Sequence, residues 1–306
     1  MAHCVRYPDG CSLEAWNHGD VRPGWHPRAV RRFLTLDLET VPDEALVSAV
    51  DGEPGRPYSE QLGRVLADRR ARTGGRSDFL PLPYHRPVAA CWVESVEDGG
   101  VVRVVDAHDW TERRGPESAF LESVWARLDG ASLVSFHGKG FDVPVLELRS
   151  LKHGVPAPPW VSPARRGSGP GHVDLKEMLA GPTGASAAPL DLYAKLVGLP
   201  GKEDVAGEDV LSLYGSGGLD RIVAYCMSDV VQTYLLFLRW RLLEGSLTPD
   251  GYVESAEQAR DALPVLFARR LGAGPRAALD GFLERCAPFF GDPSTSRRPW
   301  PALRSG

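Results

Sequence analysis

The sequence predicts a protein of the α/β class, with a mixed sheet flanked by helices. Segments that alternate apolar and polar residues, as strands do, are interspersed with segments that carry apolar residues at helical spacing. Glycine and proline separate many of these segments. The chain has 306 residues, of which 43% are hydrophobic and 25% charged, and this is long and apolar enough to bury a substantial core.

The first predicted element is a strand over residues 33–40, in which leucine occupies every second position from Leu34. The connection over residues 41–86 is rich in proline, glycine and arginine and is predicted to be irregular. A hairpin follows, with strands over residues 88–93 and 101–105. These strands predict an antiparallel part of the sheet.

The rest of the chain alternates predicted helices with short predicted strands. The predicted helices are 116–128, 141–152, 189–197 and 219–243, and the predicted strands are 132–136 and 172–175. Residues 1–32 are predicted to be a loosely ordered extension, residues 33–248 the α/β domain, and residues 249–306 a helical extension with a flexible tail.

The charge and cysteine content exclude some classes of protein. A net charge of −5 argues against a protein that coats nucleic acid through bulk charge, but allows an acidic pocket for divalent metal. Apolar runs stop well short of the roughly 20 residues that cross a bilayer, and no secretory signal is evident. We expect a cytoplasmic protein with no membrane span. The cysteines are odd in number and are expected to be reduced thiols that pack: Cys4, Cys11, Cys91, Cys226 and Cys286.

Two carboxylates in the first strand are the first candidate site residues. Asp37 and Glu39 point to one face of the strand, because side chains alternate between faces. A divalent metal would offset their desolvation and mutual repulsion. A strand end whose carboxylates lie in water would give the same pattern.

Two further acids and a tyrosine lie later in the chain. Asp142 begins a predicted helix after a buried strand and a glycine turn, where an ordinary first-turn acid is the alternative. Asp229 lies in the long apolar helix 219–243, with Tyr225 one turn before it. A buried carboxylate there needs a partner or a cation, whereas a surface-facing acid would need neither.

The order and spacing of these residues resemble the DEDD superfamily of 3′–5′ exonucleases, which have a ribonuclease-H-like fold. The motifs around these residues are similar to those of a bacterial group of predicted exonucleases related to the proofreading domain of family B DNA polymerases. The resemblance covers residues 33 to about 240, and its motifs are Leu36-Asp-Leu-Glu-Thr40, Phe136-His-Gly-Lys-Gly-Phe-Asp-Val-Pro144, His172-Val-Asp-Leu-Lys176, Gly198-Leu-Pro-Gly-Lys202 and Ala224-Tyr-Cys-Met-Ser-Asp229.

The resemblance implies roles for the matching residues. Asp37, Glu39, Asp142 and Asp229 would bind two Mg²⁺ or Mn²⁺ ions, with Asp37 bridging them. Tyr225 would mark the DEDDy branch and orient the attacking water. The substrate implied is a nucleic acid with a 3′ end, single-stranded and DNA in preference to RNA.

Two positions bear on how far the resemblance extends. Ala224 occupies the place of the base of the histidine branch, which excludes that branch. His137 stands where the family more often has asparagine, and this puts in doubt the hydrogen bond expected there. Histidine can still donate a hydrogen bond.

Several other residues are candidates for substrate contact, with a solvated or structural role as the alternative. Asp174 lies in a family-like motif but also fits an acid in an edge strand. Lys139 and Lys202 lie in glycine-rich loops, where an ammonium could contact phosphate. An arginine cluster could guide a strand towards the acids, or be a solvated loop: Arg69, Arg70, Arg72 and Arg76.

Two rival functions remain open on the sequence. Leu36-Asp-Leu-Glu-Thr40 superficially resembles the motif of phosphatases and phosphotransferases with an aspartyl nucleophile. Glu39 is one methylene too long for that motif, and Tyr225 and Asp229 have no role there. The other rival is a nucleic-acid-binding protein that has kept the fold without activity.

Overall fold

The computed structural model describes residues 30–53, 55–157, 160, 171–181, 187–201, 210–269 and 272–291. Its five-stranded sheet has the order β3-β2-β1-β4-β5. The strands are β1 (Arg31–Pro42), β2 (His85–Asp98), β3 (Val101–Thr111), β4 (Ala131–Ser135) and β5 (His172–Asp174). β1, β2 and β3 pair antiparallel in turn, whereas β4 is parallel to β1 and β5 is parallel to β4. This mixed sheet confirms the predicted α/β class and the ribonuclease-H-like fold.

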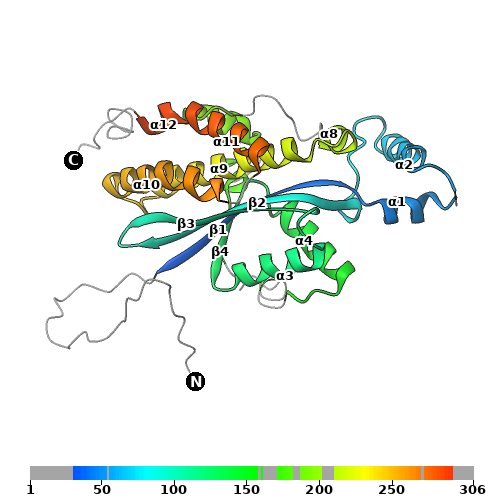
Figure 1. Ribbon diagram of the computed structural model, residues 1–306, viewed down its shortest axis with the longest axis horizontal. Coiled ribbons are helices and arrows are strands. Elements are labelled where there is room, and N and C mark those ends of the chain that lie inside the picture. The colour runs from blue at the N-terminus through cyan, green and yellow to red at the C-terminus, as the bar shows by residue number, and fades with distance from the viewer. Residues whose placement is uncertain are drawn as a thin grey trace, which may run out of the picture.

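Helices cover both faces of the sheet (Figure 1). One face carries α9 (Leu219–Leu243), α10 (Pro249–Ala268), α11 (Ala273–Arg285) and α12 (Ala287–Gly291). The other carries α3 (Glu117–Leu128) and α4 (Asp142–His153), while α1 (Glu44–Asp51) and α2 (Tyr58–Arg72) extend beyond the end of β1. The shorter helices are the 3₁₀ turn η1 (Leu82–Tyr84), α6 (Leu175–Leu179), α7 (Leu190–Leu196) and α8 (Val210–Gly215).

The alternation of β1 divides the core into two layers. Leu34, Leu36 and Leu38 pack with α3 and α4, as the leucine spacing predicts. Phe33 and Val41 face the opposite layer, formed with α9 and α10. Asp37 and Glu39 have the same parity as Phe33, so the predicted acids belong to the α9 side of the sheet.

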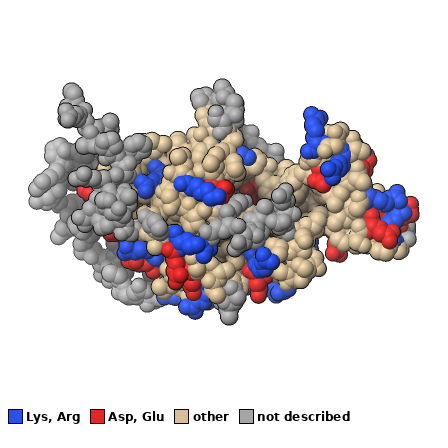
Figure 2. Space-filling view, turned by 90° about the horizontal axis from the view of Figure 1, so that it is seen from above, with Lys and Arg blue, Asp and Glu red and all other residues tan. Residues whose placement is uncertain are grey.

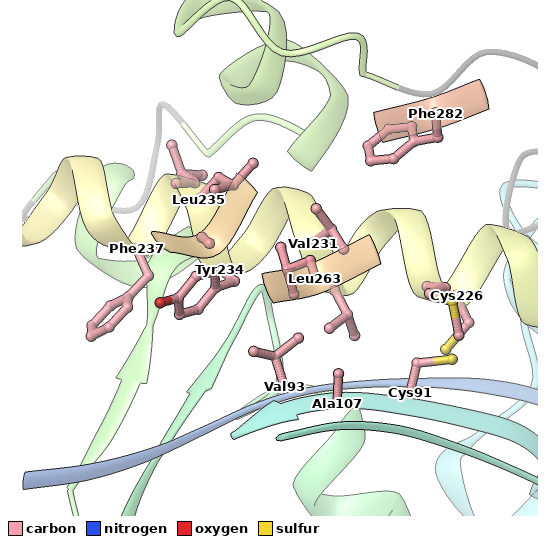
Figure 3. Packing of buried hydrophobic residues seen from close by; sticks show 14 of the residues in the cluster. Cys91, Val93, Ala107, Cys226, Val231, Tyr234, Leu235, Phe237, Leu263 and Phe282 are labelled. Carbon is pink, nitrogen blue, oxygen red and sulfur yellow. The ribbon is translucent and has the colours of Figure 1, made fainter. Parts of the chain in front are cut away.

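Helix α9 is the central helix of the core, and its bounds are those that the sequence predicts. Its length and apolar composition would allow it to cross a membrane. However, 83% of its apolar 18-residue stretch is buried inside the protein. In Figure 3, Tyr234 and Phe237 extend from α9 towards the sheet, and Val93 of β2 and Ala107 of β3 point from the sheet towards the helix. Core packing therefore accounts for the apolar character of α9.

The connection 41–86 is the main departure from the predicted secondary structure. It contains α1 and α2, so Arg69, Arg70 and Arg72 lie on a helix and not in an irregular loop. The two helices bury a small apolar cluster of their own, which includes Val47, Leu62 and Val65. Helix α2 contains several arginines and few apolar residues. The apolar spacing that would predict a helix is therefore weak in this part of the sequence.

The ends of the chain also differ in detail from the prediction. Arg31 and Arg32, predicted as part of the N-terminal extension, are the first residues of β1. Residues 1–29 and 292–306 lie outside the described residues. Helix α10 buries Tyr252 and Leu263 in the layer it shares with α9, so the predicted helical extension packs into the same core.

Asp43 links the start of α1 to α4 through hydrogen bonds of its carboxylate. Its Oδ1 accepts hydrogen bonds from the backbone N–H groups of Ala45 (3.0 Å) and Leu46 (3.2 Å), which caps α1. Its Oδ2 accepts from Arg149 and Lys152 of α4. Burial alone would raise the pKa of Asp43, but these partners outweigh burial and hold that pKa well below its usual range.

We predict that Asp43→Asn lowers the free energy of unfolding by about 1–3 kcal/mol at pH 7, because it removes charge-assisted hydrogen bonds to Arg149 and Lys152. Folding lowers the pKa of Asp43, so its contribution is present above the unfolded-state value of about 4 and is lost as the pH falls towards the folded-state value. Urea unfolding at several pH values should show the difference between variant and wild type shrinking below about pH 4. A constant difference would contradict the ionic role, and Asp98→Asn in the exposed hairpin turn is the matched control.

Candidate active site

The predicted acids of β1 lie in the part of the strand that pairs with β2 but no longer with β4. The parallel pairing of β1 with β4 ends at Thr35 and Val134, but β1 continues to Pro42. Asp37 is partly exposed there and Glu39 is buried. The pairing with β2 shifts register between Glu39 and Thr40, a bulge of the kind that re-aims side chains beside functional sites.

Asp142 occupies the edge that β4 leaves open. It is the first residue of α4, as predicted, and its Oδ1 accepts a hydrogen bond from the backbone N–H of Leu38 at 3.1 Å. Leu38 lies between Asp37 and Glu39, so the Asp142 carboxylate takes the place of a strand partner beside them. Burial raises the pKa of Asp142 to about 7, and the negative charge of Asp174 adds to the effect.

Helix α9 brings Tyr225 and Asp229 to the same place. Both side chains are buried, at 7% and 6% exposed, so the surface-facing alternative for Asp229 is wrong. Burial raises the pKa of Tyr225, and the charges of Asp229, Glu39 and Asp37 raise it further, together with a hydrogen bond to Asp229. The phenol therefore stays protonated and donates to Asp229, with the two β1 acids nearby.

A cysteine joins this group. Carboxylate oxygens of Asp37 and Glu39 and the Sγ of Cys226 lie within 4.8 Å of one another. Cys226 donates to the backbone carbonyl of Asp37 (3.4 Å), and Figure 3 shows its sulfur facing that of Cys91 across the layer between α9 and the sheet. Burial raises the pKa of Cys226 well above its usual value, and a metal ligand must be a thiolate. We therefore assign Cys226 to packing, as predicted for the cysteines. Cys91 and Cys286 are likewise buried, and Cys4 and Cys11 lie outside the described residues.

The loop that leads into Asp142 is strained and tightly packed. His137 has φ 73° and is the only non-glycine residue with positive φ in the described ranges. A Cβ at Gly138 would lie 2.4 Å from Ser135 Oγ, and one at Gly140 would lie 2.5 Å from the His137 ring. A larger residue at Gly138 or Gly140 would therefore collide with the side chain of Ser135 or His137 unless that side chain moved. Strain of this kind is typical of functional sites.

Asp174 holds this loop in place. Its Oδ1 accepts from the backbone N–H of His137 and its Oδ2 from that of Lys139, each at 2.9 Å. It also caps α6 through the N–H of Lys176 at 3.1 Å. Asp174 ends the edge strand β5, as the edge-strand alternative expects, and its side chain is buried at the junction with α6. The signal for this role is an aspartate directly before a helix, which is a typical N-cap.

Four of the other candidates for substrate contact have side-chain partners within the protein: Lys139, Arg69, Arg72 and Arg76. Lys139 Nζ pairs with Glu177 of α6. Arg69 Nε donates to the backbone carbonyl of Phe79 (2.9 Å), Arg76 Nε donates to that of Thr73 (2.9 Å), and Arg72 pairs with Asp68 (2.8 Å). Lys202 lies outside the described residues. Arg69, Arg72 and Arg76 thus stabilise the end of α2 and the loop that follows it.

A model of a known protein family matches residues 77–271, well over half of the chain. The family is described as a predicted 3′–5′ exonuclease related to the exonuclease domain of PolB. The matched range contains Asp142, Tyr225 and Asp229 and begins after Asp37 and Glu39.

Comparison with curated proteins gave no match. Among solved structures, the family B DNA polymerase from the hyperthermophilic archaeon Pyrobaculum calidifontis is similar, with 17% sequence identity and a TM-score of 0.44. The similarity covers 85% of this chain and 29% of the polymerase chain. By its family match, which confirms the resemblance seen in the sequence, the chain belongs to the predicted 3′–5′ exonucleases related to the exonuclease domain of PolB.

Proposed function

We propose that the protein is a metal-dependent 3′–5′ exonuclease of the DEDDy type, which removes nucleotides from the 3′ end of a single-stranded nucleic acid. The observation that carries the proposal is the meeting of Asp37, Glu39 and Asp229 around the Tyr225 phenol. DNA is favoured over RNA because the family is related to a domain of a DNA polymerase. The aspartyl-nucleophile rival gives Tyr225 and Asp229 no role, so their position beside Asp37 favours the nuclease.

The donor atoms fit two Mg²⁺ or Mn²⁺ ions. Asp37, Glu39, Asp142 and Asp229 offer only carboxylate oxygens, which hard cations prefer. Carboxylates of like charge held close together are unfavourable without compensation. Divalent ions held by these four residues would supply the charge that polarises the scissile phosphate and acidifies the attacking water.

Tyr225 acts as a hydrogen-bond donor in this proposal and not as a base. Its pKa is raised by burial and by the three neighbouring carboxylates, which favours the protonated phenol at neutral pH. Asp229 accepts one hydrogen bond from it and is oriented by it. The phenol oxygen can at the same time accept a hydrogen bond from a water molecule and so position it.

Hydrolysis of labelled oligonucleotides tests the proposed function. With Mg²⁺, 5′-labelled single-stranded DNA should give a ladder that shortens from the 3′ end, and 3′-labelled DNA should release its label first. EDTA should stop the reaction and Mn²⁺ should restore it. Single- and double-stranded RNA and duplex DNA complete the panel. A covalent phosphoryl-enzyme formed with a small phosphate ester, and no shortening of any strand, would favour the phosphatase instead.

We predict that Asp37→Ala and Asp229→Ala each reduce the rate of nucleotide release by at least about 100-fold, as removal of a group that stabilises transition-state charge does. Circular dichroism and thermal unfolding should show that both variants remain folded. Asp98→Asn, in the hairpin turn, is the control and should keep full activity. Full activity of Asp229→Ala with Mg²⁺ would remove Asp229 from the site.

We predict a smaller loss, about tenfold, for Tyr225→Phe, because one hydrogen bond of about 1.4 kcal/mol is removed and no charge is lost. The rate constant for nucleotide release under single-turnover conditions measures this effect. A loss as large as that of Asp37→Ala would show that Tyr225 does more than orient its neighbours.

We predict that Asp174→Asn loosens residues 137–140. The amide group of asparagine would turn a donor towards the N–H of Lys139, which leaves that N–H without its acceptor. Hydrogen exchange should become faster at the amides of His137 and Lys139, and the rate of nucleotide release should fall with little change in KM. Unchanged exchange at these amides would contradict the positioning role.

A further inference from the structure

Phe79 is an exposed aromatic side chain beside the candidate active site. Its side chain is 55% exposed, and it is the only exposed aromatic residue in the described part of the chain. It lies in the loop that follows α2, within the segment between β1 and β2. A single exposed apolar residue needs no explanation by itself, but this one is held and placed in a particular way.

The backbone of Phe79 is fixed on both sides. Its N–H donates to Ser77 Oγ at 3.1 Å, and its carbonyl accepts from Arg69 Nε at 2.9 Å. Its ring lies 4.8 Å from the ring of His85, centroid to centroid. His85 is itself held, with Nδ1 2.8 Å from Thr40 Oγ1 and Nε2 3.1 Å from the Leu80 carbonyl. Phe79 is therefore a preorganised ring that remains open to solvent.

The rings around Phe79 lie on the α3–α4 side of β1 and contact residues that adjoin two of the acids in the chain. The ring of Phe141 lies 6.0 Å from that of Phe79 and 5.0 Å from that of His85, edge-on to the latter. Phe141 directly precedes Asp142, and Thr40, which bonds His85, directly follows Glu39. A row of three aromatic rings thus runs from the surface to the two chain segments that carry these acids.

Positive charge accompanies the exposed ring. A groove of about 460 Å³ lies beside α1 and α2, and Leu80 and Pro81, which follow Phe79, also line it. Its charged lining residues are three arginines and two aspartates: Arg64, Arg69, Arg72, Asp51 and Asp68. Figure 2 shows lysine and arginine side chains, mixed with acidic ones, at the end of the molecule that α1 and α2 form. An aromatic ring next to arginine is the usual combination for binding single strands, in which bases stack and phosphates meet cations.

We propose that Phe79 is a stacking platform for an unpaired base of the single strand whose 3′ end lies at the four acids. This inference rests on the proposed function, since it assumes that the substrate reaches those acids. It gives the α1–α2 unit, which the sequence did not predict, a part in substrate selection. Stacking needs an unpaired base, so the platform favours single-stranded over duplex ends.

Equilibrium binding tests the proposal without requiring hydrolysis. Fluorescence anisotropy with the full chain and a labelled single-stranded oligonucleotide in EDTA should show Kd about tenfold higher for Phe79→Ala, as the loss of one stacked base predicts. Phe79→Trp should bind as wild type, because it keeps an aromatic face. Val265→Ala, at an exposed apolar position on α10, is the matched control and should change nothing.

A scan of abasic positions separates stacking from a structural role. One abasic position near the 3′ end should raise the Kd of wild type about tenfold and leave that of Phe79→Ala unchanged. Equal effects of every abasic position on both proteins, or an unchanged Kd for Phe79→Ala, would overturn the proposal. If wild type binds in this Phe79-dependent way but never shortens a strand, the proposed exonuclease fails while the platform stands.

Discussion

The concentration of negative charge at the end of β1 is the constraint on which the rest of the site depends. Asp37 and Glu39 lie on a central strand, Asp142 fills the edge that β4 vacates, and Asp229 approaches from α9. Burial of like charges is costly, and the packing of α9 and α4 against β1 holds the groups there nonetheless. A divalent cation would offset this cost, and carboxylate oxygens are the ligands that hard cations favour.

The sheet could be predicted, and the four acids could be proposed as site residues, because their signals are local. Leucine alternation from Leu34 fixes the faces of β1, and the spacing of Tyr225 and Asp229 places both on one side of α9. Contacts between residues that are far apart in the chain could not be predicted from the sequence. The hydrogen bond from Leu38 to Asp142 joins residues that are 104 positions apart, and no periodicity records it.

The structural parts that sequence reasoning missed share a physical reason. Helix α2 is rich in arginine and has few buried residues, so its apolar pattern is weak and tertiary contacts such as the small cluster around Val47 and Leu62 stabilise it. Asp174 gave an N-cap signal, but its more distant partners, His137 and Lys139, come from another loop. In both cases tertiary contacts, and not local propensity, determine the structure.

The face alternation of β1 ties the chemistry to the pairing of the sheet. A slip of one residue between β1 and β2 would exchange the two faces of β1. Asp37 and Glu39 would then enter the aliphatic layer that α3 and α4 form, and Leu36 and Leu38 would turn towards Tyr225 and Asp229. The carboxylates proposed to bind metal would thus penalise misaligned strands, so the same two residues would favour correct pairing during folding.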